Sequence, residues 1–335
     1  MGAPADTAIV NRWEQPHIVA GDWKHERRMA VRSSAELRSI LDLPPAGDAA
    51  TDFPVLAPWP LIRRMRPGDP HDPLLLQVLS RDAEQRETPG YTSDPLHEAE
   101  ASPQPGLIHK YHGRALLIVT GACALHCRYC FRREFPYAAH ADGRLDAALA
   151  HLATQPDLGE IILSGGDPLS LDDDRLDVLL TRLEAIPHLH TLRIHTRYPI
   201  AIPARVTAAL RARLAASRLR RVIVVHVNHA QEIDTDVRQA LSELGDVATL
   251  LNQAVLLRDI NDHVDTLAQL SQRLWSCGVL PYYLHQLDAV SGTAHFAVTD
   301  ARARELHRGL QAVLPGYLLP RLVREIPGAT SKTAL

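Results

Sequence analysis

The stretch ALLIVTGACALHCRYCF, residues 115 to 131, joins a short apolar run to a loop that holds three of the four cysteines of the chain. The run ALLIVT is almost free of polar side chains, as expected for a strand buried on both faces of a parallel sheet. Five similar runs follow it: EIILSG (160–165), TLRIHT (191–196), RVIVVHVN (221–228), ATLLNQAVLL (248–257) and LPYYLHQ (280–286). The chain from residue 115 onward therefore predicts six strands.

Segments with the length and composition of helices separate these strands: DAALAHLAT, DRLDVLLTRLEAI, PARVTAALRARLAA, TDVRQALSEL and VDTLAQLSQRLWSC. Each is long enough to form the crossover that two parallel neighbouring strands require. Six βα units are too few for a closed eight-stranded barrel, so the pattern predicts an α/β fold with an open partial (β/α)6 barrel. A last helix, TDARARELHRGLQAVLP, and a strand within LVREI complete the predicted elements.

The first 105 residues lack the alternation of strands and helices, because many prolines interrupt them. Ser33 to Glu36 match a capping box and predict a helix that ends before Pro44. DPLLLQVLSRD, which begins at Asp72, predicts a second helix with Pro73 in its first turn. We therefore predict two regions, an N-terminal helical wrapper over residues 1–105 and the partial barrel over residues 106–335.

The composition excludes some classes of function. The chain has 335 residues and a formal net charge of −3, and its arginines are scattered among acidic residues. A nucleic-acid-binding protein would show a basic stripe, so no nucleic-acid partner is expected. No apolar run reaches the roughly 18 residues of a membrane span, and charged residues occur early in the chain. The sequence therefore predicts a cytoplasmic protein that acts without a membrane and whose thiols stay reduced.

The cysteines Cys123, Cys127 and Cys130 follow the first predicted strand directly. In βα folds the chemistry lies at the carboxyl ends of the strands, so this position indicates a functional site. Three thiolates can hold three irons of a 4Fe-4S cluster and leave the fourth iron open to a small molecule. The alternatives are a zinc site completed by His126 or His140, or three thiols with a structural role only.

Two further features of the sequence point to the same end of the sheet. SGGDPL closes the second strand, and its residues Ser164, Gly165, Gly166 and Asp167 could grip an amine or carboxylate through the backbone; the alternative is a tight turn in which Asp167 is a cap. The chain contains only the lysines Lys24, Lys110 and Lys332, so any Schiff-base chemistry must use one of them. Lys24 lies in a charged run, Lys110 is interpreted as structural, and Lys332 follows the open loop PGATS.

The spacing C-x3-C-x2-C resembles the signature of radical S-adenosylmethionine enzymes, in which Tyr129 matches a common aromatic position. The chain as a whole resembles the lysine 2,3-aminomutase family over most of residues 110–335. The segments that carry this resemblance are LLIVTGACALHCRYCFRR, LSGGDPL, RIHTRYPIAIPARVT, HVNHAQEI, NQAVLLRDIND, PYYLHQLDAVSGTAHF and PGATSKT. The short chain resembles the branch called EpmB, which is thought to make (R)-β-lysine for modifying elongation factor P.

The resemblance implies a radical SAM type of partial barrel with three cofactors, a 4Fe-4S cluster, S-adenosylmethionine and pyridoxal 5′-phosphate. It implies that the SGGD segment holds the adenosylmethionine amine and that Lys332 carries the pyridoxal. It also implies an electron donor such as flavodoxin or ferredoxin and a functional link to elongation factor P and its lysyl ligase. It leaves open whether the protein is a homo-oligomer.

The same resemblance implies roles for four further residues. Arg132 matches the arginine that clamps the substrate carboxylate, with a solvent-facing arginine as the alternative. Asp288 and Glu325 match two carboxylates that hold the distant ammonium of lysine, and a desolvated cation needs such partners. Glu325 departs from the family pattern, which has aspartate there, and this puts the depth of the pocket in doubt. Arg114 matches an arginine near the pyridoxal or, alternatively, has a structural role at the strand edge.

Other functions remain open at this point. One is an aminomutase for a different amino acid such as glutamate, although an acidic side chain would be repelled by Asp288 and Glu325. Another is an iron-sulfur or zinc protein that binds a partner without turnover, and a third is a radical enzyme without pyridoxal. The histidines His195, His226, His229 and His285 end predicted strands and are interpreted as hydrogen-bonded core or rim residues.

Overall fold

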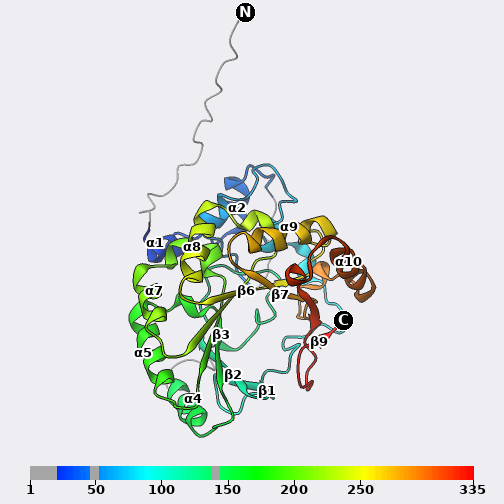
Figure 1. Ribbon diagram of the computed structural model, residues 1–335. Helices are drawn as coiled ribbons and strands as arrows, with labels where there is room; N and C mark the ends of the chain where they lie inside the picture. Colours follow the sequence, from blue (N-terminus) through cyan, green and yellow to red (C-terminus); the bar gives the residue numbers. More distant parts are fainter. Residues whose placement is uncertain (1–20, 46–52, 138–143) are drawn as a thin grey trace, which may run out of the picture.

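The computed structural model describes residues 21–45, 53–137 and 144–335 and contains one nine-stranded sheet whose strands are neighbours in chain order (Figure 1). Seven strands run parallel, and a short strand pairs antiparallel at each end. The strands are β1 Leu107–Tyr111, β2 Arg114–Thr120, β3 Glu160–Gly165, β4 Thr191–Thr196, β5 Arg220–Val225, β6 Thr249–Val255, β7 Leu280–His285, β8 Arg321–Arg324 and β9 Thr333–Ala334. The sheet curves without closing, so the predicted open partial barrel is confirmed.

The six predicted barrel strands correspond to β2 through β7. β8 overlaps the predicted strand LVREI (322–326), which it precedes by one residue and shares over residues 322–324. Strands β1 and β9 were not predicted. β1 forms a hairpin with β2 in which Tyr111 faces Arg114 and Gly113 has a φ of +75°. A two-residue turn with a glycine at positive φ is typical of a hairpin. The strand before it was not predicted because the polar residues His109 and Lys110 interrupt its apolar pattern.

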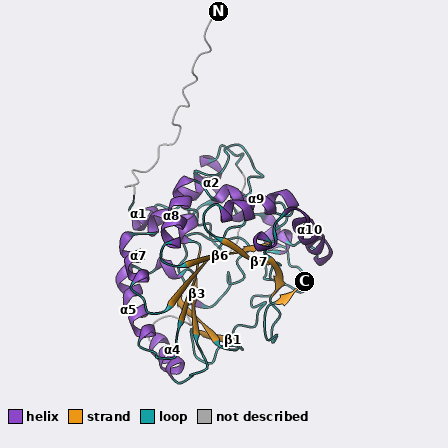
Figure 2. Ribbon diagram, viewed as in Figure 1, coloured by secondary structure: helices purple, strands orange, loops and turns teal. Residues whose placement is uncertain are grey.

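Helices cover the outer side of the sheet (Figure 2). The helices that connect or follow the strands are α4 Arg144–Ala153, α5 Asp173–Glu184, α6 Tyr198–Ala201, α7 Ala208–Ala215, α8 Thr235–Gly245, α9 Val264–Trp275 and α10 Asp300–Val313. Side-chain oxygens of Asp172, Thr207, Asp234 and Thr299 accept a backbone N–H in the first turn of α5, α7, α8 and α10. These caps explain why the helices begin where they do. Short 3-10 helices are η4 Pro168–Ser170, η5 Pro203–Arg205, η6 Ala230–Glu232, η7 Ala294–Phe296 and η8 Gly316–Leu318.

The N-terminal region contains short helices joined by turns, and its apolar side chains share one core with the barrel. Its elements are α1 Trp23–Arg28, α2 Ser34–Ile40, α3 Trp59–Ile62, η1 Leu75–Gln77 and η2 Asp82–Gln85. The predicted cap of α2 is confirmed, since Ser33 Oγ accepts the N–H of Glu36 at 3.3 Å. The helix predicted from Asp72 is wrong: only η1 forms, because the buried Asp72 carboxylate accepts the N–H groups of Leu74 and Leu75 and holds a turn. The region boundary at residue 105 stays a prediction.

None of the helices in the described ranges is long and apolar enough to cross a membrane.

The N-terminal region also holds the loop that carries the cysteines. His126 N donates to Leu56 O at 3.0 Å, and Arg128 N donates to Gln77 O at 2.8 Å. The fully buried guanidinium of Arg128 donates through Nε to Glu84 at 2.8 Å, and Arg133 donates to the same carboxylate at 2.8 Å. Glu84 thus compensates two arginines that flank Cys130 on either side, and this fixes the cysteine loop against residues 53–85.

A Glu84→Gln variant is expected to lose about 3–5 kcal/mol of unfolding free energy, because it removes the carboxylate charge that pairs with the buried Arg128 guanidinium. Urea unfolding followed by circular dichroism measures this loss. The matched control is Glu305→Gln, which removes an exposed carboxylate paired with Arg302 and is expected to change stability by less than about 1 kcal/mol. Equal stability of the two variants would contradict the role assigned to Glu84.

Candidate active site

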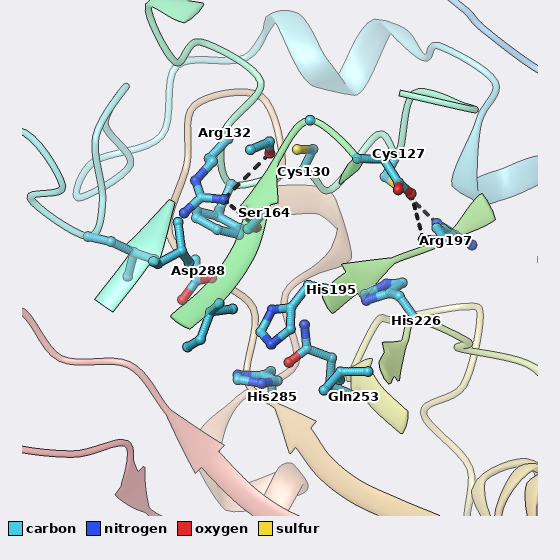
Figure 3. A pocket seen from close by; sticks show the side chains of 18 of the residues that line it. Cys127, Cys130, Arg132, Ser164, His195, Arg197, His226, Gln253, His285 and Asp288 are labelled. Atoms are coloured by element: carbon cyan, nitrogen blue, oxygen red, sulfur yellow. Dashed lines mark hydrogen bonds between the residues drawn. The ribbon is translucent and has the colours of Figure 1, made fainter. Parts of the chain in front are cut away.

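The carboxyl ends of the parallel strands surround a cavity of about 710 Å³. All twelve residues for which the sequence predicts a role line this cavity: Arg114, Cys123, Cys127, Cys130, Arg132, Ser164, Gly165, Gly166, Asp167, Asp288, Glu325 and Lys332. Figure 3 shows the side chains of Cys130, Arg132, Asp288 and His195 around the same space. Residues from the beginning and from the end of the barrel sequence, such as Arg114 and Lys332, therefore lie at one site.

The three cysteines occupy the loop after β2, and a backbone hydrogen bond from Cys130 N to Cys127 O (3.0 Å) closes a turn between the last two. Burial and the nearby Cys127 thiol raise the pKa of Cys130 to about 12, and burial raises the pKa of Cys123 well above its usual value. Three thiolates at this place therefore need a positive charge beside them. His126, a candidate fourth zinc ligand, directs Nδ1 to Pro54 O at 2.9 Å, and His140 lies outside the described residues.

The two glycines of SGGDPL let the loop after β3 pack against the cysteine loop. Gly165 has a φ of +120°, which favours glycine, and a Cβ there would lie 2.5 Å from Thr120 O. A Cβ on Gly166 would lie 2.4 Å from Ala122 O. The backbone of Gly166 donates to Thr120 O at 2.7 Å. The two glycines thus allow a close approach of the backbone, as the sequence predicts. In the structure the group that approaches them is the backbone of Thr120 and Ala122.

A Gly166→Ala variant is expected to bind S-adenosylmethionine at least about tenfold more weakly, because the added methyl group must push the cysteine loop away from the loop after β3. Calorimetric titration of the anaerobically reconstituted protein measures the affinity. Gly316→Ala is the control, since no atom lies within 4 Å of a Cβ built at that glycine. Unchanged affinity in Gly166→Ala would show that the loop tolerates displacement.

Asp167 ties the end of β3 to the end of β4. Its carboxylate accepts hydrogen bonds from Thr196 Oγ1 (2.7 Å), the backbone N of Arg197 (2.7 Å) and the backbone N of Leu169 (3.0 Å). The last bond caps η4, as the alternative interpretation of the sequence predicts. Burial raises the pKa of Asp167 to about 6. The residue therefore fixes the floor of the cavity around the SGGD segment.

Arg132 is buried, so its alternative interpretation as a solvent-facing arginine is wrong. Its Nε and Nη2 atoms donate to the two carboxylate oxygens of Glu98 at 2.7 and 2.8 Å. Its Nη1 atom donates to Ser164 Oγ at 3.0 Å (Figure 3). Such a bidentate pair fixes the guanidinium plane, which leaves the Nη1 end directed towards the SGGD segment.

Lys332 lies in the cavity beside Glu325. Lys332 Nζ donates to one oxygen of Glu325 at 2.6 Å, and Lys110 Nζ donates to the other at 2.9 Å. Burial alone would raise the pKa of Glu325, but the two ammonium groups outweigh it and lower the pKa to about 2. Lys110, interpreted from the sequence as structural, therefore lines the same cavity as Lys332 and shares its carboxylate.

Asp288 differs from Glu325 in its surroundings, because no hydrogen bond or ion pair to its carboxylate is found among the described residues. Burial, followed by the charge of Glu325, raises the pKa of Asp288 to about 7. A carboxyl group in this condition is poised to ionise when a cation arrives. Arg114 lines the cavity and lies over the ring of Tyr111, with 4.7 Å between its Cζ and the ring centroid.

Three of the four strand-end histidines line the cavity: His195, His226 and His285. The expectation that they are all hydrogen-bonded is wrong for His195, whose buried Nε2 has no partner in the described part of the chain. Burial lowers the pKa of His226 and of His285 to about 3, so both are neutral. His229 instead caps η6 through Nδ1.

Sequence reasoning did not identify three charged residues at this site, namely Glu98, Lys110 and Arg197. Glu98 pairs with Arg132 and lies 3.7 Å from Lys110. Arg197 donates to Cys127 Sγ at 2.8 Å. The scarcity of lysine could have drawn attention to Lys110, but no local motif marks Glu98 or Arg197.

The chain is strongly similar to known proteins over nearly its whole length, although no protein-family model matches it. It is 50% identical over 323 residues to L-lysine 2,3-aminomutase of Escherichia coli K12, covering 94% of each chain. It is 45% identical to the Haemophilus influenzae protein of the same name, covering 84% of each chain. The chain belongs to the lysine 2,3-aminomutase family.

More distant relatives share this name. L-lysine 2,3-aminomutase of Clostridium subterminale is 33% identical over 328 residues, which cover 93% of this chain and 77% of that protein. Among solved structures, a radical SAM methyltransferase from Sphaerobacter thermophilus gives a TM-score of 0.45 at 16% identity and covers 65% of this chain and 68% of that one. As a member of the lysine 2,3-aminomutase family, the chain is an isomerase.

Membership of the lysine 2,3-aminomutase family implies a 4Fe-4S cluster, S-adenosylmethionine and pyridoxal 5′-phosphate as cofactors. The donors on the cavity wall fit these groups. No three His, Cys, Asp or Glu side chains of the described residues converge on a single metal ion. A 4Fe-4S cube does not require such convergence, because each of its cysteines binds a separate iron. Lys332 supplies an amine, and Arg114 supplies a cation suited to a phosphate.

Proposed function

We propose that the chain converts L-α-lysine to (R)-β-lysine and that this product supplies the modification of elongation factor P by its lysyl ligase. The observation that carries the proposal is that three cavity-facing thiols and the amine of Lys332 share one cavity. Moving an amine to the neighbouring carbon requires removal of hydrogen from an unactivated carbon, which no side-chain base can do. The bound cofactors supply the carbon radical for that step and hold the migrating nitrogen.

We propose that Cys123, Cys127 and Cys130 bind three irons of the cluster and that the segment Ser164–Asp167 holds S-adenosylmethionine beside the fourth. Lys332 is proposed to bind pyridoxal phosphate, with Arg114 as a cationic partner. These roles are supported by the fixed position of the cysteine loop, which Glu84 and Gln77 hold through Arg128, and by the packing of Gly166 against Ala122.

Arg132 is proposed to bind the substrate carboxylate. Its Nε and Nη2 atoms are held by Glu98, so the proposed donor is the Nη1 end, which faces Ser164. This arrangement fixes the α-carbon end of the substrate near the proposed adenosylmethionine segment, and a fixed geometry is what such a hydrogen transfer requires.

Asp288 and Glu325 are proposed to hold the ε-ammonium of lysine. Glu325 already has two ammonium partners, Lys110 and Lys332, whereas Asp288 has none within residues 21–45, 53–137 and 144–335. We therefore propose that Asp288 is the principal partner of the substrate cation and that Glu325 contributes once Lys332 is engaged with the cofactor. Two carboxylates at this end of the cavity favour a cationic amino acid over glutamate.

The deciding experiment incubates reduced, reconstituted protein with L-lysine, S-adenosylmethionine and pyridoxal phosphate and analyses the products by chiral chromatography. (R)-β-lysine is the expected product. A product from another amino acid and none from lysine would overturn the substrate, and failure to cleave S-adenosylmethionine would favour a binding module. We propose further that the protein acts in the cytoplasm with reduced flavodoxin or ferredoxin, and parallel assays with free and protein-attached lysine identify the form that it uses.

A further inference from the structure

The guanidinium of Arg197 lies against a sulfur atom of the cysteine loop. Arg197 follows β4 directly and is 7% exposed. Its Nη1 atom donates to Cys127 Sγ at 2.8 Å (Figure 3) and also to the hydroxyl of Tyr129. An arginine is positively charged at any pH at which the protein folds, so a fixed positive charge touches one of the three proposed cluster ligands.

Three further contacts fix this arginine in place, and a fourth fixes the tyrosine hydroxyl to which it donates. Its Nη2 atom donates to Gln77 Oε1 at 2.6 Å and to Glu232 Oε2 at 2.9 Å. Its backbone N donates to Asp167 Oδ2 at 2.7 Å. The hydroxyl of Tyr129 also lies 2.9 Å from Nε2 of His226. Gln77 of the N-terminal region and Glu232 of η6 therefore hold the guanidinium, and Asp167, which follows β3, holds the backbone. The side chain has little freedom to turn away from Cys127.

Glu232 compensates the positive charge of the buried Arg197 guanidinium. It is fully buried, and its Oε1 atom accepts the backbone N–H groups of Asn228 at 2.9 Å and His229 at 3.1 Å. The carboxylate accepts from Nη2 of Arg197, whereas the thiol accepts from Nη1. The buried pair is close to neutral overall, yet it presents its positive end to the sulfur.

A hydrogen bond and a positive charge at a cluster ligand change the ease with which the cluster accepts an electron. Reduction adds negative charge that is shared by the coordinating sulfurs, so a donor to one of them stabilises the reduced state more than the oxidised state. The effect is strong in a buried site, because little water is present to screen it.

We propose that Arg197 is a positioning residue that raises the reduction potential of the cluster by donating a hydrogen bond to Cys127 Sγ. The inference rests on the proposed role of Cys123, Cys127 and Cys130 as cluster ligands. It adds a function to a residue that carries no cluster-binding motif and that the described aminomutase chemistry does not otherwise use.

The experiment measures the midpoint potential of the reconstituted cluster by electron paramagnetic resonance at a series of poised potentials. In Arg197→Gln, the equilibrium constant for one-electron reduction is expected to fall at least about tenfold, which corresponds to about 59 mV towards more negative potential. In Glu232→Gln, which leaves the guanidinium uncompensated, the potential is expected to move in the positive direction. Shifts of opposite sign are the signature of an electrostatic effect, since simple loosening of the site would move both variants the same way.

Arg197→Gln leaves the Glu232 carboxylate buried without its cation, so this variant is at risk of unfolding. The double variant Arg197→Gln with Glu232→Gln avoids that cost and still lacks the donor to Cys127. Its potential is expected to lie below that of Glu232→Gln alone. Iron and sulfide contents and circular dichroism establish that each variant carries a complete cluster in a folded chain.

Arg205→Gln is the matched control. Arg205 is fully buried, pairs with Asp173 at 2.8 Å and donates to Leu169 O at 2.8 Å, but it does not touch a thiol. Its replacement is expected to leave the potential unchanged. A potential in the Arg197 variants equal to that of the wild type, or an equal shift in Arg205→Gln, would overturn the inference. If the wild-type chain assembles no cluster, the proposed function fails first, and the inference falls with it.

Discussion

A Lys332→Ala variant is expected to lose at least about three orders of magnitude in turnover and to lose the visible absorbance of bound pyridoxal phosphate. The chain has only three lysines, and Lys24 is exposed on α1. Lys332 lines the cavity, and its Nζ lies 5.9 Å from the centroid of the Tyr283 ring. An aromatic face beside the amine is suited to a flat pyridine ring, which supports this assignment over an idle tail lysine.

The structure supplies a competitor to Lys332 that the sequence did not suggest. Lys110 and Lys332 bind the two oxygens of the same carboxylate, Glu325, so both amines are within reach of one cavity. Borohydride reduction of the pyridoxal-loaded protein followed by peptide mass mapping identifies the lysine that is attached. We expect the label on the peptide containing Lys332 in the wild type and in Lys24→Ala, the control. Label on Lys110 in the wild type would refute the assignment.

The fold could be predicted largely because each barrel strand is a short apolar run bounded by a helical segment. EIILSG and TLRIHT match β3 and β4 residue for residue. β3 is a continuously buried run, whereas β4 alternates buried apolar positions with half-buried ones. The failures have a local cause. The helix from Asp72 did not form because a buried carboxylate captured the backbone amides that a helix would have used. β1 was missed because its exposed His109 and the ion-paired Lys110 interrupt the apolar pattern.

The candidate site could be predicted where a motif marks it, because carboxyl ends of parallel strands meet at one edge of the sheet. Cys123, Ser164, Asp288 and Lys332 come together for this reason. The ion pairs behind them could not be predicted. Glu98 contacts Arg132 because of the path that the irregular segment before β1 takes across the barrel. No repeating pattern of apolar residues marks that path in the sequence.

An Asp288→Asn variant is expected to lose about 10²- to 10³-fold in kcat/KM with lysine, because it removes the carboxylate charge proposed to bind the substrate ammonium. The pH dependence follows from the raised pKa of about 7, caused by burial and then by Glu325. Lysine needs the ionised form, so kcat/KM of the wild type is expected to fall about tenfold for each pH unit below 7. Steady-state assays from pH 5.5 to about 8.5 measure both effects.

The same substitution is expected to stabilise the protein. A carboxyl group whose pKa is higher in the folded than in the unfolded state opposes folding once it ionises, so the penalty begins above the unfolded value of 3.8 and is complete above about pH 7. Asp288→Asn should therefore gain on the order of 1–3 kcal/mol at pH 8 and nothing at pH 4. Asp300→Asn is the control, and its expected change in stability has the opposite sign. The hydrogen bond from Arg324 lowers the pKa of Asp300, so loss of this carboxylate should destabilise the protein at pH 8. A variant at Asp288 that loses both activity and stability at pH 8 would show that the carboxylate has a structural role, whereas loss of activity with a gain in stability is what a substrate-binding carboxylate must show.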